Sequence, residues 1–131
     1  MTKKTINVVG AAIIKDNKFL AMQRSEQMTL SGFWEFPGGK IEANETDEET
    51  LIREIKEELK IDIRVLDYIN EASYDYDFGT VVLKVYTAEI VSGQITLEEH
   101  SDSKWLTAGE LLDIDWAPVD IPAAKALTTY L

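Results

Sequence analysis

The 131-residue sequence contains no cysteine and only one histidine, His100. Without cysteine, the chain has no disulfide, thiol nucleophile or iron–sulfur cluster, and a single histidine cannot complete a Cys/His zinc site. A chain of this length can still bury enough apolar surface to fold without cross-links. The absence of cysteine is compatible with a reducing compartment, and we expect a cytoplasmic protein.

Long apolar runs and basic residues are also scarce. No stretch approaches the roughly 18 uncharged residues of a transmembrane helix, and Asn7 interrupts the N-terminal apolar segment before it could form the core of a signal peptide. There are 13 lysines and arginines against 24 aspartates and glutamates, which gives a formal net charge of -11. This charge repels nucleic-acid polymers and anionic membranes, so we expect neither as a partner. A small phosphorylated ligand would need a divalent cation to bind.

The sequence has only three prolines and no linker, repeat or low-complexity tract, so we expect a single domain over residues 1–131. Runs rich in β-branched and aromatic residues predict strands at 6–14, 19–23, 61–68, 80–91 and 103–106, with turns at Asp16-Asn17 and Ser92-Gly93.

Helix starts are indicated by two capping boxes and one proline. Thr46 with Glu49 opens a helix that runs to about residue 59, and Thr107 with Glu110 opens a shorter one. Asp120 before Pro122 is typical of the N-cap and first turn of a C-terminal helix. Because strands and helices alternate irregularly, we predict an α/β (α+β) fold, a sandwich around a mixed β-sheet.

The long helix has an apolar arc and an acidic arc. Residues Leu51, Ile52, Ile55 and Leu59 share the first, which we expect to pack on the sheet; Glu54, Glu57 and Glu58 share the second. The acidic arc is either a solvated surface or a cation site. A Gly-rich turn expected at residues 36–40 precedes the helix and favours the site, because its backbone can approach a ligand closely. Carboxylate and carbonyl oxygens are the ligands that Mg²⁺ or Mn²⁺ prefers.

The spacing around this helix resembles the Nudix box. In that pattern a glycine, five residues, a glutamate and seven residues precede Arg-Glu-aliphatic-any-Glu-Glu-any-Gly-aliphatic. Gly39, Glu45 and the segment 53–61 match every defined position except one, because Lys60 stands where the pattern has its last glycine. A non-glycine residue in a left-handed helix cap is penalised by roughly 1 kcal/mol.

The resemblance implies roles for the box residues. Glutamates at the positions of Glu54, Glu57 and Glu58 ligate the divalent cations and take part in catalysis, helped by the backbone carbonyl at Gly39. Glu45 and Arg53 pair structurally and orient the loop and helix. The chemistry implied is cation-assisted attack of water on a phosphoanhydride.

Beyond the box, the sequence is similar to the MutT-like nucleoside triphosphate pyrophosphohydrolases. This similarity implies that Arg24 and Lys40 contact substrate phosphates. Glu99 matches an acidic residue outside the box that assists the metal or the attacking water, and the neighbouring Glu98 is the alternative. Arg24 could instead be an ordinary exposed arginine.

The same similarity places the base near the C-terminal segment. Asp120 would hydrogen-bond the base edge or cap the helix, and an ionised carboxylate suits the donors of guanine or cytosine. Tyr76 and Phe78 would stack on the base or belong to the core. Gly79 stands where some relatives carry an arginine.

The resemblance therefore implies Mg²⁺-dependent hydrolysis of a nucleoside triphosphate to the monophosphate and pyrophosphate, by a monomer or homodimer whose only partner is its small nucleotide substrate. Oxidised guanine nucleotides such as 8-oxo-dGTP are the favoured substrates, and cytidine triphosphates are the close alternative. Another nucleoside diphosphate-linked substrate, or a non-catalytic nucleotide sensor, stays open. Retention of all the box carboxylates counts against the sensor.

Overall fold

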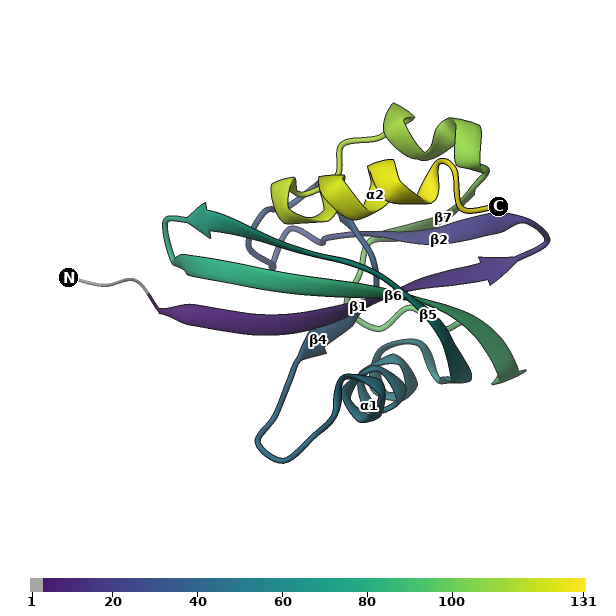
Figure 1. Ribbon diagram of the computed structural model, residues 1–131, viewed down its shortest axis with the longest axis horizontal. Coiled ribbons are helices and arrows are strands. Elements are labelled where there is room, and N and C mark those ends of the chain that lie inside the picture. Colours follow the sequence, from purple (N-terminus) through teal and green to yellow (C-terminus); the bar gives the residue numbers. More distant parts are fainter. Residues whose placement is uncertain (1–3) are drawn as a thin grey trace.

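The computed structural model describes residues 4–131 as three layers, with a mixed sheet between two sets of helices (Figure 1). The first three residues, with which the predicted single domain begins, lie outside the described part. The elements are β1 (Thr5–Lys15), β2 (Lys18–Gln23), β3 (Trp34–Glu35), β4 (Gly38–Lys40), α1 (Asp47–Leu59), β5 (Ile61–Tyr76), β6 (Gly79–Gly93), β7 (Asp102–Leu106), the 3₁₀ helices η1 (Ala108–Asp113) and η2 (Pro118–Asp120), and α2 (Ile121–Leu127).

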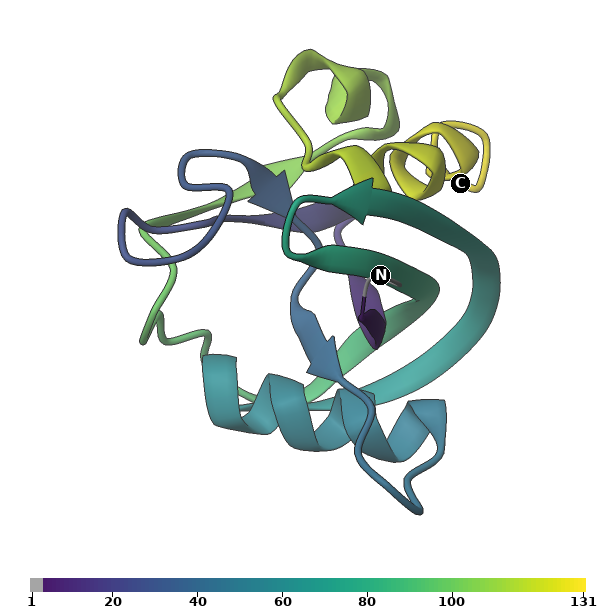
Figure 2. The same cartoon turned by 90° about the vertical axis from the view of Figure 1, so that its left-hand side faces the viewer.

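The sheet follows the order β3-β2-β1-β6-β5, with β4 added to β1 and β7 added to β2. The β1–β6 pair is parallel and the other pairs are antiparallel, so the predicted mixed sheet is confirmed. Helix α1 lies on one face and α2 with the 3₁₀ helices on the other (Figures 1 and 2). Apolar residues of β1 alternate between two cores, Val9 and Ile13 facing α1 and Ala12 facing α2.

The predicted strands are all present, and each is at least one residue longer than predicted. The predicted turn at Asp16 and Asn17 connects β1 to β2, with both residues at positive φ. Strand β5 continues to Tyr76 instead of ending near residue 68, because register shifts let it bend while it stays paired with β6 (Figure 2). The turn expected at Ser92-Gly93 is wrong, since both residues pair with the start of β5.

Helix α1 begins at the predicted capping box, in which Thr46 Oγ1 accepts from the Glu49 amide at 3.1 Å and the Glu49 carboxylate accepts from the Thr46 amide at 2.9 Å. The predicted packing face is wrong at one residue. Ile52 is 44% exposed, whereas Thr50 is fully buried. The helix is therefore rotated so that the acidic side of the apolar arc, including Glu58, turns toward the sheet.

Two further expectations about local structure are corrected. Residues 38–40 form strand β4 against β1 instead of a turn. Asp120 stands at the N-cap of α2, but its side chain makes no cap hydrogen bond, because it accepts from the Phe36 amide instead.

Lys60 ends α1 in the left-handed conformation, with φ 62° and ψ 32°. We expect Lys60→Gly to raise the free energy of unfolding by about 0.5–1 kcal/mol, because glycine adopts this conformation without a Cβ penalty. The exposed contacts of the Lys60 amine, with the Glu57 carbonyl and the Glu98 carboxylate, contribute little. Chemical denaturation would measure the gain. Lys60→Ala is the control, since it removes the amine but keeps the strain; an equal gain in that variant would contradict the explanation.

Candidate functional site

One cavity of about 670 Å³ opens between α1, the β5–β6 turn and the segment 94–101. It brings together the residues that the sequence assigned to metal, phosphate and base: Arg24, Gly39, Lys40, Glu54, Glu57, Glu58, Tyr76, Phe78, Glu99 and Asp120. The two structural residues of the box, Glu45 and Arg53, do not line it. Of the described residues, seven with acidic side chains line the cavity, against two cationic ones, Arg24 and Lys40, and the imidazole of His100.

The acidic end of the cavity is formed by α1 and the segment 94–101. The Glu58 side chain is 18% exposed and that of Glu54 20%, whereas Glu57 is 61% exposed. Burial, and after it the nearby charges of Glu35, Glu54 and Glu99, raises the pKa of Glu58 to about 8. The cluster therefore carries more negative charge than the protein around it compensates.

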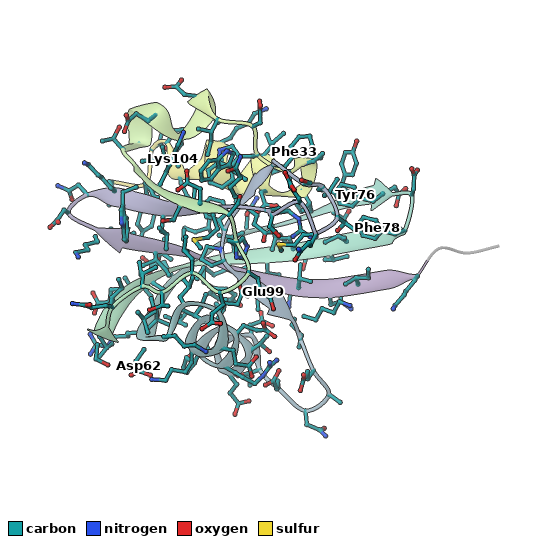
Figure 3. All side chains as sticks on the ribbon, turned by 180° about the vertical axis from the view of Figure 1, so that it is seen from behind. Phe33, Asp62, Tyr76, Phe78, Glu99 and Lys104 are labelled. Atoms are coloured by element: carbon teal, nitrogen blue, oxygen red, sulfur yellow. The ribbon has the colours of Figure 1, made fainter. Side chains whose placement is uncertain are left out.

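Of the two neighbouring acids in the segment 94–101, Glu99 is the one whose charge acts on this cluster. Glu99 is among the charges that raise the pKa of Glu58, and Glu98 is not among them. Glu98 instead lies 3.7 Å from the Lys60 amine, in an exposed ion pair. Figure 3 shows Glu99 beside the sheet, between α1 and the aromatic residues at the strand ends.

The two glycines of β4 lie very close to their neighbours, Gly38 to backbone atoms of β1 and Gly39 to the Glu54 side chain. A Cβ on Gly38 would lie 1.9 Å from the Val9 carbonyl oxygen, and one on Gly39 would lie 2.3 Å from the Glu54 carboxylate carbon. Hydrogen bonds from the Ala11 amide to Pro37 and from the Ile41 amide to Asn7 bracket the β1–β4 ladder.

Because hydrogen-bonded pairs alternate along an antiparallel ladder, this register makes Val9 and Gly39 such a pair. The Gly39 carbonyl therefore faces β1, and the Gly38 carbonyl faces away from it. Lys40 lies two residues after Gly38, so its carbonyl also faces away from β1. This carbonyl accepts from Arg53 at 3.4 Å.

Arg53 fixes the loop before α1 to the acidic face of the helix. Its guanidinium donates to both carboxylate oxygens of Glu45, at 2.7 and 2.9 Å, and to Glu54 at 2.8 Å. The same guanidinium holds the pKa of Glu45 at about 2. The structure thus contains the predicted Glu45–Arg53 pair and adds a direct bond to Glu54.

Arg24 is not an ordinary exposed arginine. It donates to the backbone carbonyl and hydroxyl of Thr29, and its NH1 lies 2.6 Å from a Glu35 carboxylate oxygen. These bonds hold the segment after β2 in place and leave the guanidinium at the wall of the cavity.

Two residues of this wall, Glu35 and His100, were not predicted from the sequence. The second Glu35 oxygen lies 2.7 Å from Nε2 of His100, whose other ring nitrogen is 3.7 Å from Glu58. Two features of the sequence could have pointed to them. Glu35 is an acid shortly before the two glycines, and His100 is a lone histidine beside Glu99. Neither residue belongs to the box, so its spacing could not identify them.

The other end of the cavity is aromatic. Tyr76 and Phe78 stack with ring centroids 5.2 Å apart and an interplanar angle of 5°, at the turn between β5 and β6 (Figure 3). Tyr76 is both a core residue and part of the cavity wall, whereas Phe78 is largely exposed. The Tyr76 hydroxyl accepts from the Val119 amide at 3.1 Å, which ties the turn to η2.

Asp120 lies at the bottom of this aromatic end and is 4% exposed. One of its oxygens accepts from the Phe36 amide at 3.1 Å. Burial, and after it the charge of Glu35, raises the pKa of Asp120 well above its usual range. The raised pKa favours the neutral acid, which both donates and accepts, over the ionised, acceptor-only carboxylate expected from the sequence.

The acidic end fits a hard cation in its chemistry. All its charged donors are carboxylate oxygens, and burial together with repulsion between these carboxylates raises the pKa of Glu58. Within residues 4–131, no three His, Asp or Glu side chains are already arranged to hold a metal ion. The side chains would have to close around the cation, and the exposed Glu57 has the freedom to do so.

An α/β/α sandwich whose cavity has a carboxylate-rich end and an aromatic end defines a class of proteins suited to binding a small phosphorylated aromatic compound. Residues 4–127 match the NUDIX domain family, so the chain belongs to this family. It is a MutT-like Nudix hydrolase, an enzyme that acts on phosphoanhydride bonds. Nudix hydrolases require a divalent metal ion.

Relatives support this assignment along nearly the whole chain. The CTP pyrophosphohydrolase of Escherichia coli K12 is 35% identical over 94% of this chain and 91% of its own length. The 8-oxo-dGTP diphosphatase of Proteus vulgaris is 32% identical over 77% of this chain and 91% of its own. The solution structure of the MutT protein of methicillin-resistant Staphylococcus aureus 252, a Nudix hydrolase, is 49% identical, with a TM-score of 0.81 and coverage of 99% and 100%.

None of the helices described between residues 4 and 131 is long and apolar enough to span a membrane.

Proposed function

We propose that the protein hydrolyses an oxidised guanine nucleoside triphosphate of the 8-oxo-dGTP type to the monophosphate and pyrophosphate, with Mg²⁺ as its cation. The observation that carries the proposal is that one cavity of about 670 Å³ has carboxylates at one end and, at the other, stacked aromatic rings with Asp120. A nucleoside triphosphate has the matching sequence of groups, a polyphosphate joined through a sugar to an aromatic base.

The residues that would hold the metal are Glu54, Glu57 and Glu58, with a glycine carbonyl of β4. The Gly38 carbonyl is a better candidate than the predicted Gly39 carbonyl, because the ladder with β1 turns it outward. When bound, the cations offset phosphate charge and lower the pKa of the attacking water. Since the described part of its wall carries seven acidic side chains against the cationic Arg24 and Lys40, the cavity would otherwise repel a triphosphate.

The chain's own residues would orient the reactants. Glu99 lines the same cavity as the box glutamates and would position the water or take its proton. Arg24 and Lys40 line the same cavity and would hold phosphate oxygens. Arg24 is already ordered by Thr29 and Glu35, so little side-chain entropy is lost when a phosphate binds.

The proposed base preference rests on the hydrogen-bonding groups of Asp120. Its Oδ2 accepts from the Phe36 amide, so the neutral acid can present its hydroxyl and an acceptor to a base edge. Oxidation of guanine at C8 places an N–H at N7 beside the O6 acceptor, which matches this pair, whereas ordinary guanine offers two acceptors there. Cytosine, with its N4 amino group beside N3, matches as well and makes CTP the second candidate.

The test is a panel of triphosphates, containing 8-oxo-dGTP, dGTP, CTP and dCTP, incubated with the purified protein and Mg²⁺ while pyrophosphate and monophosphate are followed. Glu57→Gln is the matched control, because Glu57 is exposed and its replacement should not disturb the fold. We expect wild-type turnover to be highest with 8-oxo-dGTP. Wild type and Glu57→Gln being equally inactive on every triphosphate, while both are folded, would refute the proposed function; a preference for nucleotide sugars or dinucleotides would move it to another substrate class.

Replacement of Asp120 separates base reading from packing. We expect Asp120→Asn to keep kcat/KM for the preferred triphosphate within about fivefold, because an amide also donates and accepts. Asp120→Ala should lower it at least about tenfold, and leaving the buried Phe36 amide without its acceptor should cost about 1–3 kcal/mol of unfolding free energy. Steady-state kinetics with denaturation curves measure both effects. Equal kinetics in the two variants would contradict base reading by Asp120.

A further inference from the structure

Three segments that are distant in the sequence meet at the ring of His100. The ring is only 5% exposed, and each of its nitrogens faces a carboxylate from a different element. Nε2 lies 2.7 Å from Glu35 of β3, and Nδ1 lies 3.7 Å from Glu58 of α1. Since a carboxylate only accepts, Nε2 carries the donated proton, and the Nδ1 contact lies just outside hydrogen-bond distance.

The Glu35 carboxylate is shared. Its Oε1 accepts from Arg24, the arginine at the cavity wall, while its Oε2 accepts from His100. A continuous chain of contacts therefore runs from Arg24 through Glu35 and His100 to Glu58. It connects the basic part of the cavity wall with the acidic helix.

His100 also fixes the segment that carries Glu98 and Glu99. The segment is tied at its start by the Thr96 amide, which donates to the Leu59 carbonyl at 2.9 Å, and at its end by the Ser101 amide, which donates to the Gln23 carbonyl at 3.0 Å. Between these two backbone bonds, the described contacts between side chains are the part-buried His100–Glu35 bond, the 3.7 Å approach of His100 to Glu58 and the exposed Glu98–Lys60 pair. Two of these three contacts are made by His100, the residue directly after Glu99.

We propose that His100 is a positioning residue: its Nε2–H bond to Glu35 holds Glu99 over the acidic helix and fixes the position of Arg24 relative to Glu58. The proposal rests on the proposed function for its kinetic consequences. It adds a role for a residue that touches neither phosphate nor base. A ring in this position acts through Glu35 and Glu99, so its loss should affect turnover more than substrate affinity.

The kinetic test compares replacements of His100 that differ in whether the new side chain can reach Glu35. In His100→Gln the side-chain amide can take the place of Nε2 and donate to Glu35, whereas in His100→Asn, one methylene shorter, it ends near Nδ1 and cannot. His100→Phe keeps the bulk of the ring without its nitrogens. We expect His100→Gln to retain kcat within about fivefold and the other two to lose about 10–100-fold, with KM changing less than threefold. A merely structural role would instead lower the stability of all three variants and leave His100→Gln and His100→Asn with equal kcat.

A spectroscopic readout does not require turnover. Because the chain has one histidine, a long-range ¹H–¹⁵N spectrum contains a single imidazole. We expect the Nε2–H form in the free protein, and shifts of the ring signals on adding Mg²⁺ alone, which acts near Glu58, and on adding a non-hydrolysable methylene analogue of dGTP with Mg²⁺, which reaches Arg24.

The two readouts separate the hypotheses. An inactive wild type whose ring responds to both additions would refute the proposed function and leave the coupling intact. An Nδ1–H form, a ring that responds to neither addition, or equal kcat in His100→Gln and His100→Asn would overturn the positioning role.

Discussion

Glu58→Gln is expected to abolish turnover and, in the absence of metal, to stabilise the fold. The carboxylate is buried among Glu35, Glu54 and Glu99, which raises its pKa in the folded state from an ordinary 4.5 to about 8. Glutamine has the same size but no charge, so it removes the repulsion without leaving a cavity. As a proposed metal ligand, Glu58 should contribute more than the 10–100-fold that outer-shell partners of metals provide, so kcat/KM should fall more than about 100-fold.

The sign of the stability effect follows from linkage. Because the folded pKa lies above the unfolded one, the contribution of Glu58 is fully present below pH 4.5 and is lost as the pH rises through about 8. In a chelating buffer, the free energy of unfolding of the wild type should therefore fall by a few kcal/mol relative to Glu58→Gln between these pH values, since one pKa unit corresponds to about 1.4 kcal/mol.

Denaturation curves at a series of pH values measure this difference. Asp120 also has a raised pKa and a slope of the same sign, but it is common to both proteins and cancels in the comparison. Glu57→Gln is the control, because this exposed carboxylate should affect activity while leaving the pH dependence of stability unchanged. Parallel stability curves for wild type and Glu58→Gln would show that burial does not destabilise the ionised carboxylate. Retained activity in Glu58→Gln would remove it from the metal site.

Mg²⁺ should reverse the stability order. A ligand that binds only the folded state stabilises it in proportion to the logarithm of its concentration above Kd. The wild type, with all its carboxylates, should gain more from added Mg²⁺ than Glu58→Gln, most clearly above pH 8 where Glu58 no longer holds a proton. The same carboxylate thus destabilises the metal-free fold and strengthens the metal complex.

The elements whose signals are local were predictable from sequence. The capping box at Thr46 and Glu49 and the Asp16-Asn17 turn depend on residues a few positions apart, and both are present. The box identified Glu54, Glu57 and Glu58 because their spacing on one helix is itself the signal. All of them line the cavity.

The errors arose where a distant segment decides a local choice. The apolar arc of α1 predicts burial of Ile52, but the sheet packs on the side that includes Thr50. Asp120 has the sequence position of an N-cap, yet the Phe36 amide, 84 residues away along the chain, takes its oxygen. The glycines of β4 look like a turn, but β1 pairs with them. His100 and Glu35 meet across 65 residues, and no periodicity in the sequence reports that contact.

Arg53→Lys is expected to lower kcat by about 10–100-fold, although the charge is kept. The guanidinium reaches both oxygens of Glu45 and one of Glu54 at once, which a single ammonium group cannot do. Glu54 would then lose the bond that orients it, and the loop before α1 would lose its anchor on the helix. Because Arg53 does not line the cavity, KM should change much less than kcat.

A second measurement separates orientation of Glu54 from a general loss of stability. The Arg53 bond holds the pKa of Glu45 at about 2, so its stabilising effect is present above the ordinary value of 4.5 and is lost as the pH falls through 2. Wild type and Arg53→Lys should therefore differ in stability at neutral pH and converge near pH 2. Glu45→Gln is the matched control, since it loosens the loop while leaving the Arg53–Glu54 bond. If Glu45→Gln lowers kcat as much as Arg53→Lys does, the loop alone explains the effect; a larger loss in Arg53→Lys assigns the remainder to the orientation of Glu54.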